Sequence, residues 1–99
     1  MSPLDGIPIA IKDNLWVKGL QSSAVSKSLK SFVSPTDSTS VKRLKDAGAI
    51  IIGTANMDEF GMGSYGQYGY QGEFVKNPID SEYFAGGSSA GSATTVKSY

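Results

Sequence analysis

The stretch "DSTSVKRLKDAGAIIIGT", residues 37–54, decides the expected fold. Its beginning is typical of a helix with one apolar side, because Val41, Leu44 and Ala47 recur at a spacing of three residues. Asp37 precedes this pattern, and aspartate is one of the residue types that commonly cap the N-terminus of a helix. The stretch therefore predicts a helix that begins after Asp37 and packs through one side.

A glycine turn and an apolar segment follow this helix. Gly48 is expected just past the C-terminus, where glycine adopts a positive φ without strain. The run "AIIIGT" at residues 49–54 is typical of a strand buried on both faces, and so is "IPIAI" at residues 7–11. Pro8 has no backbone N–H to donate to a neighbouring strand, which argues against a fully paired central position for this residue. A helix, a tight turn and a buried strand in succession indicate an α/β architecture in which both strands share one sheet.

The other segments carry weaker patterns. A loop rich in Ser, Gly and Lys is expected up to about residue 35, with a helical turn near residues 26–29, and residues 88–99 predict the start of a helix. The glycine-rich segment from residue 61 contains three closely spaced tyrosines, Tyr65, Tyr68 and Tyr70. We expect these rings to pack within the loop rather than to stack on nucleic-acid bases, because no basic groove accompanies them.

Composition excludes several classes of chemistry. The 99 residues contain no cysteine and no histidine, so disulfides, a thiolate nucleophile, an imidazole base and a Cys/His metal cluster are excluded. Catalysis would then depend on Ser, Thr, Tyr, Lys or carboxylates. Basic and acidic side chains balance at 9 each, which gives no basic stripe for nucleic acid. The sequence has neither an apolar run of membrane-span length nor a targeting pattern at its start.

Two short polar segments are candidates for function. Lys12 begins "KDN" at the end of the first expected strand, and the stretch "AGGSSAGSA" covers residues 85–93. Taken alone, Lys12 fits a solvated lysine at a strand end, and the Gly/Ser stretch fits a flexible linker. The functional alternative is that the glycines of residues 85–93 let a ligand come close to the backbone, and that Lys12 faces a ligand at the strand end.

Three stretches, in this order, resemble the N-terminal part of the amidase signature family: "PLDGIPIAIKDN" at residues 3–14, "VKRLKDAGAIIIGTANMDEFGMGS" at 41–64, and "AGGSSAGSA" at 85–93. Within that family, "NMDEFGMGS" at residues 56–64 is most similar to the A subunits of glutamyl-tRNA(Gln) amidotransferases. The resemblance implies an α/β fold with a mixed central sheet flanked by helices. It also implies that residues 1–99 are a partial domain that stops before the nucleophile serine.

The resemblance implies roles for individual residues. The family triad consists of a serine nucleophile, a second serine that follows a cis peptide bond, and a lysine. The lysine corresponds to Lys12 and the second serine to Ser88, which would relay a proton between Lys12 and the nucleophile. A lysine accepts a proton only in its neutral form, which burial favours.

Further residues receive supporting roles. The resemblance places part of the substrate-side wall at Met62, Gly63 and Ser64, and it gives Gly86, Gly87 and Ser89 the support of the serine loop. The adjacent carboxylates Asp58 and Glu59 are expected to cap a helix or form local salt links, since neighbours in sequence do not face one site.

The function implied is that of a glutamine-hydrolysing amidotransferase component, which supplies ammonia for converting Glu-tRNA(Gln) to Gln-tRNA(Gln). The expected partners are a B subunit, which would hold ATP and Mg²⁺ and most of the tRNA contacts, and a small accessory subunit. No cofactor or metal is expected in this chain, nor any membrane contact. Two alternatives stay open: part of a stand-alone amidase, or a non-catalytic module that binds a partner. The high content of Ser, Thr and Tyr favours a mitochondrial protein, with the bacterial cytoplasm as the alternative.

Overall fold

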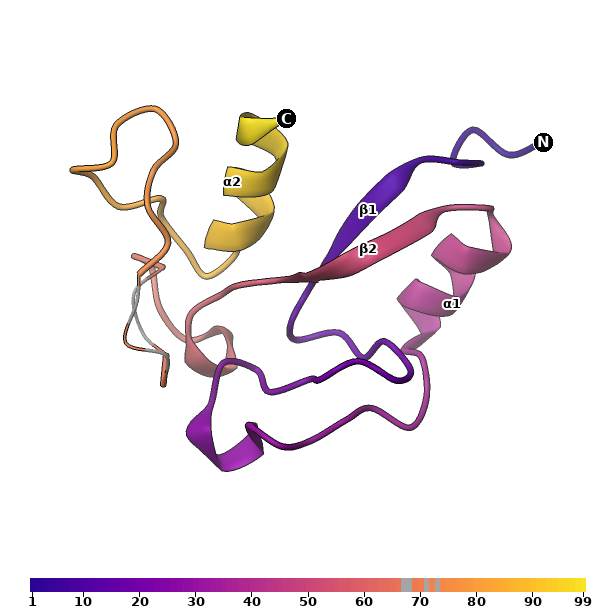
Figure 1. The fold of residues 1–99 in the computed structure, drawn as a ribbon, viewed down its shortest axis with the longest axis horizontal. Coiled ribbons are helices and arrows are strands. Elements are labelled where there is room, and N and C mark those ends of the chain that lie inside the picture. Colours follow the sequence, from indigo (N-terminus) through magenta and orange to yellow (C-terminus); the bar gives the residue numbers. More distant parts are fainter. Residues whose placement is uncertain (67–68, 71, 73) are drawn as a thin grey trace.

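The computed structural model describes residues 1–66, 69–70, 72 and 74–99 (Figure 1). Its elements follow in the order β1 (Pro8–Lys12), η1 (Lys27–Leu29), α1 (Thr39–Asp46), β2 (Ile50–Ala55), η2 (Glu59–Gly61) and α2 (Ala90–Ser98), where η marks a 3₁₀ helix. Long loops join β1 to α1 and η2 to α2 (Figure 1). The predicted helices, strands and helical turn are therefore all present, with ends shifted by a few residues.

The two strands pair in parallel, which confirms that they share a sheet. The pairing runs from Pro8 opposite Ile50 to Lys12 opposite Ala55, so the carboxyl ends of both strands lie side by side. Pro8 occupies the first strand position, where a missing donor is tolerated. Among the described residues this parallel pair is the only sheet, so they contain only a parallel part of the mixed sheet that the family fold implies.

A bulge interrupts this pairing and involves a glycine. Ile9 lies opposite Ile51, but Ala10 lies opposite Gly53, which leaves Ile52 as the extra residue on β2. Gly53 has a φ of 155°. A glycine inside a strand commonly marks such a bulge, because a side chain would restrict the backbone there.

The expectation that both strands are buried on both faces is wrong for this chain. Side chains of Ile50 and Ile52 on β2 are 54% and 61% exposed, whereas Ile51 between them is half-buried. Ile51 and Ile9 pack against the core that α1 closes. On the opposite face, α2 and the sheet border an open cleft of about 680 Å³. Within the described part of the chain, only one face of the sheet is well covered.

Helix α1 closes the hydrophobic core as the spacing of its apolar residues predicts. Val41 is completely buried against Ile11 of β1 and Val17 of the following loop, and Leu44 packs beside them. Burying such side chains is the main favourable contribution to folding. The helix thus holds β1 and the loop after it in one unit.

The N-cap of α1 is Ser38 and not Asp37. The side chain of Ser38 accepts a hydrogen bond from the backbone N–H of Val41 at 3.5 Å. Asp37 has other partners: its carboxylate accepts the backbone N–H of Lys18 at 2.7 Å and pairs with the ammonium of Lys45 at 2.8 Å. A serine one position later satisfies the helix end, so the carboxylate is used to tie the preceding loop to the helix.

The C-terminal end of α1 agrees with the prediction. Gly48 has a φ of 89°, and its N–H donates to the carbonyl of Lys45. The N–H of Ala49 reaches back to the carbonyl of Leu44. These two bonds form the Schellman arrangement, which ends a helix and turns the chain directly into β2.

The tyrosine-rich loop is partly described. Tyr65 packs against Phe84 with ring centroids 5.5 Å apart, and the N–H of Tyr70 donates to the carbonyl of Val25. Tyr68 lies outside the described residues. The contact of Tyr65 agrees with packing within the loop. No described helix has the length and apolar character that crossing a membrane requires.

Candidate active site

Lys12 is the last residue of β1 and lies half-buried opposite Ala55, the last residue of β2. The chain after β2 continues through Asn56 to Asp58 and then into η2. In α/β folds, ligands commonly bind outside the carboxyl ends of parallel strands. The sheet therefore places the amine of Lys12 at the edge where a functional site is expected.

The serine loop meets Lys12 at this edge. The Nζ atom of Lys12 donates to the Oγ of Ser88 at 2.8 Å and to the Oγ of Ser89 at 2.7 Å. The peptide bond between Gly87 and Ser88 is cis, as the resemblance implied. Ser89 also occupies the N-cap position of α2. The structure thus brings together both residues that were matched to the triad, and Ser89 with them.

The start of α2 is tied to the segment that follows β2. The N–H of Gly91 donates to the carbonyl of Asn56 at 2.9 Å, and a Cβ on Gly91 would lie 2.5 Å from the backbone nitrogen of Asn56. The N–H of Asp58 donates to the carbonyl of Ser88 at 3.3 Å. These contacts hold the serine loop against the strand ends, which fixes Ser88 relative to Lys12.

Asp58 is a buried anchor of the site that sequence reasoning missed. Its side chain is completely buried, and its Oδ2 accepts the N–H of Gly66 at 3.1 Å. A Cβ on Gly63 would lie 2.6 Å from its Cγ, and a Cβ on Gly87 would overlap its Oδ2. The expected capping role is wrong, since the Asp58 side chain makes no cap bond to the η2 helix that it precedes. No local pattern in the sequence marks this role, because Gly66 and Gly87 meet the carboxyl group only through the fold.

The stretch matched to the substrate wall lies next to Ser88. A Cβ on Gly61 would lie 3.9 Å from the Oγ of Ser88, so the chain enters Met62 beside the hydroxyl. The side chain of Met62 is 79% exposed, Ser64 is exposed, and Gly63 is half-buried against Asp58. Their contact with a substrate stays a prediction.

The loop-support residues form the backbone of this site. Gly86 has a φ of 81°, a conformation that favours glycine, and Gly87 packs against Asp58. The hydroxyl of Ser89 faces the amine of Lys12. Their support of a catalytic serine stays a prediction.

This arrangement is suited to proton transfer. A neutral amine in direct hydrogen-bond contact with a hydroxyl can accept its proton as that hydroxyl takes a proton from a third group. The described residues contain no group of three or more His, Cys, Asp or Glu side chains that could hold a metal ion. The role of this pair as a general base with a hydroxyl relay stays a prediction.

Comparison with known proteins gives consistent matches over nearly the whole chain. The family model described as Amidase matches residues 1–97. The A subunit of glutamyl-tRNA(Gln) amidotransferase from Lachnoclostridium phytofermentans is 54% identical over 95 residues, which cover 96% of this chain and 19% of that protein. The crystal structure of the corresponding A subunit from Thermotoga maritima matches with a TM-score of 0.87 at 42% identity, over 93% of this chain and 21% of that chain.

A solved structure of a protein with another name matches as well. Allophanate hydrolase of Kluyveromyces lactis has a TM-score of 0.83 at 44% identity, over 95% of this chain and 15% of that chain.

The chain spans about one fifth of the length of the amidotransferase relatives named above. The match over residues 1–97, together with the fold and the serine loop at the strand ends, establishes that the chain belongs to the amidase family.

Proposed function

We propose that this chain carries the general base and the proton relay of a glutamine-hydrolysing amidotransferase A subunit. The observation that carries the proposal is the hydrogen bond of 2.8 Å between the Nζ of Lys12 and the Oγ of Ser88. The relative that is 54% identical supports the choice of this branch within the family. So does the stretch "NMDEFGMGS" at residues 56–64.

In the proposed reaction, neutral Lys12 accepts the proton of the Ser88 hydroxyl, and Ser88 accepts the proton of a serine nucleophile expected outside residues 1–99. The nucleophile attacks the side-chain carbonyl of glutamine and forms an acyl-enzyme. Lys12, now protonated, returns its proton through Ser88 to the leaving nitrogen, which departs as ammonia. Water then hydrolyses the acyl-enzyme and releases glutamate.

The substrate and the loop take defined places in this proposal. Met62, Gly63 and Ser64 form one wall beside glutamine, because the chain reaches them directly past the Ser88 hydroxyl. Gly86, Gly87 and Ser89 hold the relay serine in place.

The released ammonia would pass to a partner. In the proposal a B subunit holds ATP and Mg²⁺ and amidates Glu-tRNA(Gln), and a small accessory subunit completes the complex. The relatives are named as single subunits of an amidotransferase, which supports a multi-subunit assembly. The balance of 9 basic and 9 acidic side chains fits tRNA contacts made mainly by the partner.

A second candidate is a stand-alone amidase that acts on another amide. The match to an allophanate hydrolase favours it, because that enzyme shares this part of the fold and has a different activity. The mitochondrial compartment stays an expectation from composition. The relative that is 54% identical is from Lachnoclostridium phytofermentans, which favours the alternative of a bacterial cytoplasm.

The test uses the full-length protein that carries this segment, assembled with its partner subunits. Lys12→Met keeps a long side chain without a basic nitrogen, and we expect it to lower glutamine hydrolysis by ~10²–10⁴-fold. Amidation of Glu-tRNA(Gln) with added ammonia should stay at the wild-type rate, because that step belongs to the partner. The matched control is Lys42→Met on the exposed side of α1, which should leave both rates unchanged.

Two outcomes would contradict the proposal in different ways. Glutamine hydrolysis near the wild-type rate in Lys12→Met would show that Lys12 is a solvated lysine at a strand end. A wild-type protein that hydrolyses another amide but not glutamine would favour the stand-alone amidase.

A further inference from the structure

All three non-glycine residues with a positive φ in the described part of the chain meet at one contact. Ala24 and Val25 follow each other in the loop after β1 with φ values of 48° and 55°, and Phe60 of η2 has a φ of 51°. The N–H of Phe60 donates to the carbonyl of Ala24 at 2.9 Å. Such a φ is strained for residues with a side chain, most of all for a β-branched valine, and it persists only where the surroundings enforce it. Because backbone strain clusters at functional sites, this contact is a candidate for a role in the reaction.

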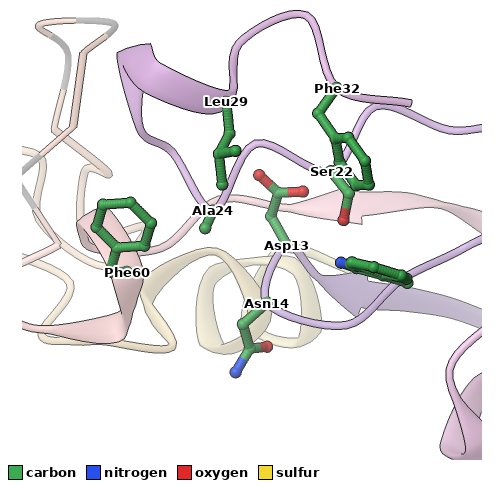
Figure 2. Close-up of a pocket in the computed structure, with 8 residues that line it drawn as sticks. Asp13, Asn14, Ser22, Ala24, Leu29, Phe32 and Phe60 are labelled. Atoms are coloured by element: carbon green, nitrogen blue, oxygen red, sulfur yellow. The ribbon is translucent and has the colours of Figure 1, made fainter. Parts of the chain in front are cut away.

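The side chain of Asp13 holds the turn formed by Ala24 and Val25. Its Oδ2 accepts the hydroxyl of Ser23 at 2.9 Å and the N–H of Val25 at 3.3 Å, and all three residues are buried. In Figure 2, Ala24 lies between Asp13 and Phe60. Without the carboxyl group, the Ser23 hydroxyl would lose its acceptor and the Val25 N–H would keep only the Oγ of Ser23. Loss of a partner at a buried polar group is costly, so the turn depends on Asp13.

The main chain of Asp13 is fixed independently of this side chain. Its N–H donates to the carbonyl of Ala55 at 3.1 Å, just beyond the pairing of Lys12 with Ala55. Among the described residues, no hydrogen bond or ion pair joins the Asp13 carboxyl group to Lys12, whose amine contacts Ser88 and Ser89 instead. The carboxyl group can therefore be changed while the contacts that hold the amine remain.

The hydrogen bond from Phe60 to Ala24 extends this support to the segment beside Ser88. Gly61 follows Phe60 directly, and a Cβ on Gly61 would lie 3.9 Å from the Oγ of Ser88. The next residues, 62–64, are the proposed wall beside glutamine. The turn thus fixes the point from which the chain enters that wall.

We propose that Asp13 is a positioning residue, which acts through the Ala24–Val25 turn and Phe60 to place the wall beside the substrate. Its effect is on the binding of glutamine and not on proton transfer between Lys12 and Ser88. This inference rests on the proposed function, since it assigns a part of the glutamine site.

The experiment measures the rate of glutamine hydrolysis against glutamine concentration, with the full-length protein assembled with its partner subunits. Asp13→Ala should raise KM about tenfold and keep kcat within about threefold, because a displaced wall weakens substrate binding while the reacting groups stay in place. Asp13→Asn keeps an oxygen acceptor for the turn, and its NH2 group replaces Oδ1, which has no hydrogen-bond partner in the described part of the chain. This conservative variant should restore KM to within about twofold of the wild-type value.

A second variant tests the same link where Asp13→Ala fails to fold. Ser23→Ala removes one donor to the carboxyl group but leaves the bond from Val25, so KM should rise only about threefold. Hydrogen exchange followed by mass spectrometry should show faster exchange at the Phe60 N–H in Asp13→Ala and Ser23→Ala. The matched control, Asp46→Ala at the exposed end of α1, should change neither KM nor this exchange.

The outcomes separate this inference from the proposed function. A wild-type KM in Ser23→Ala, or a fall in kcat alone in Asp13→Ala, would overturn the inference. A KM in Asp13→Asn as high as in Asp13→Ala would overturn it too, because an acceptor oxygen would then not be what holds the turn. If Lys12→Met hydrolyses glutamine near the wild-type rate, the proposed function fails and the inference fails with it. If Lys12→Met is inactive and the Asp13 and Ser23 variants keep the wild-type KM, only the inference fails.

Discussion

The Nζ of Lys12 donates a hydrogen bond of 2.8 Å to the Oγ of Ser88, although 76 positions separate the two residues in the chain. The contact exists because β1 and β2 end side by side and because Gly91 fastens the start of α2 to Asn56. It follows that Lys12 and Ser88 should act as one proton-transfer unit.

A double mutant tests whether they do so in glutamine hydrolysis by the full-length protein. Ser88→Ala alone should lower the rate by about 10²-fold or more, because it removes the relay but keeps the amine. The double variant with Lys12→Met should be little slower than Lys12→Met alone, since residues of one unit lose their effect together. Steady-state rates of ammonia release measure this. If the rate loss of the double variant equals the product of the two single losses, the two side chains act independently.

Gly63 offers a test of the Asp58 anchor. Its φ is not positive, so Gly63→Ala adds only a methyl group, which would lie 2.6 Å from the Cγ of Asp58. We expect the free energy of unfolding to fall by about 1–3 kcal/mol, because a methyl group forced into a closely packed site displaces its neighbours. Urea unfolding of the full-length protein measures the change, with Ser31→Ala on an exposed loop as the control. A wild-type midpoint for Gly63→Ala would show that the buried carboxyl group moves aside freely.

The pair of Asp37 and Lys45 predicts a pH dependence. Hydrogen bonds from the Lys45 ammonium, and then from the backbone N–H of Lys18, hold the pKa of Asp37 below its ordinary value. The stabilisation is present above the pKa that Asp37 has in the unfolded chain, and it is lost as pH falls through the lowered folded pKa. Because the pair is on the surface, its contribution to stability is small.

A carbon-detected NMR titration of the Asp37 carboxyl group measures this effect directly. Lys45→Met should raise the pKa of Asp37 toward its ordinary value, since the first cause of the lowering is removed. Lys42→Met, about one helical turn from Lys45, should leave the pKa of Asp37 as it is in the wild-type protein. If Asp37 titrates at the same pH in wild type and Lys45→Met, the salt bridge at 2.8 Å does not persist in solution.

The sequence predicted the elements well where local rules decide them. Gly48 ended α1 as expected because only glycine adopts its φ of 89° without strain. The predicted N-cap was wrong by one residue because Asp37 and Ser38 are both good capping residues. In the fold the carboxylate of Asp37 binds the backbone N–H of Lys18, and Ser38 caps the helix. The contact between Lys12 and Ser88 followed from family resemblance, since no local pattern links residues so far apart.

Other features depend on packing that no single stretch reveals. Asp58 was expected to cap a helix or form a local salt link, yet its side chain is buried in space that Gly63 and Gly87 leave open, and its Oδ2 accepts the N–H of Gly66. The Oδ1 of Asp13 has no hydrogen-bond partner among the described residues, and this could not be foreseen either, because the fold of the loop places Ser23 and Val25 against the other oxygen.

The exposed side of the sheet gives the last prediction. Ile50 and Ile52 are 54% and 61% exposed on β2, and Val96 of α2, across the open cleft, is 81% exposed. Apolar surface next to unpaired strand edges promotes association, so the 99-residue chain purified alone should aggregate at micromolar concentrations. Ile50→Lys and Ile52→Lys should reduce this aggregation, because charges on an exposed strand oppose edge pairing, while Ile51→Lys should worsen it by breaking the packing against α1. Light scattering during dilution from urea measures all three variants against wild type. A wild-type chain that stays monomeric and unfolds in one cooperative transition would contradict the prediction, and would favour the non-catalytic module that folds by itself.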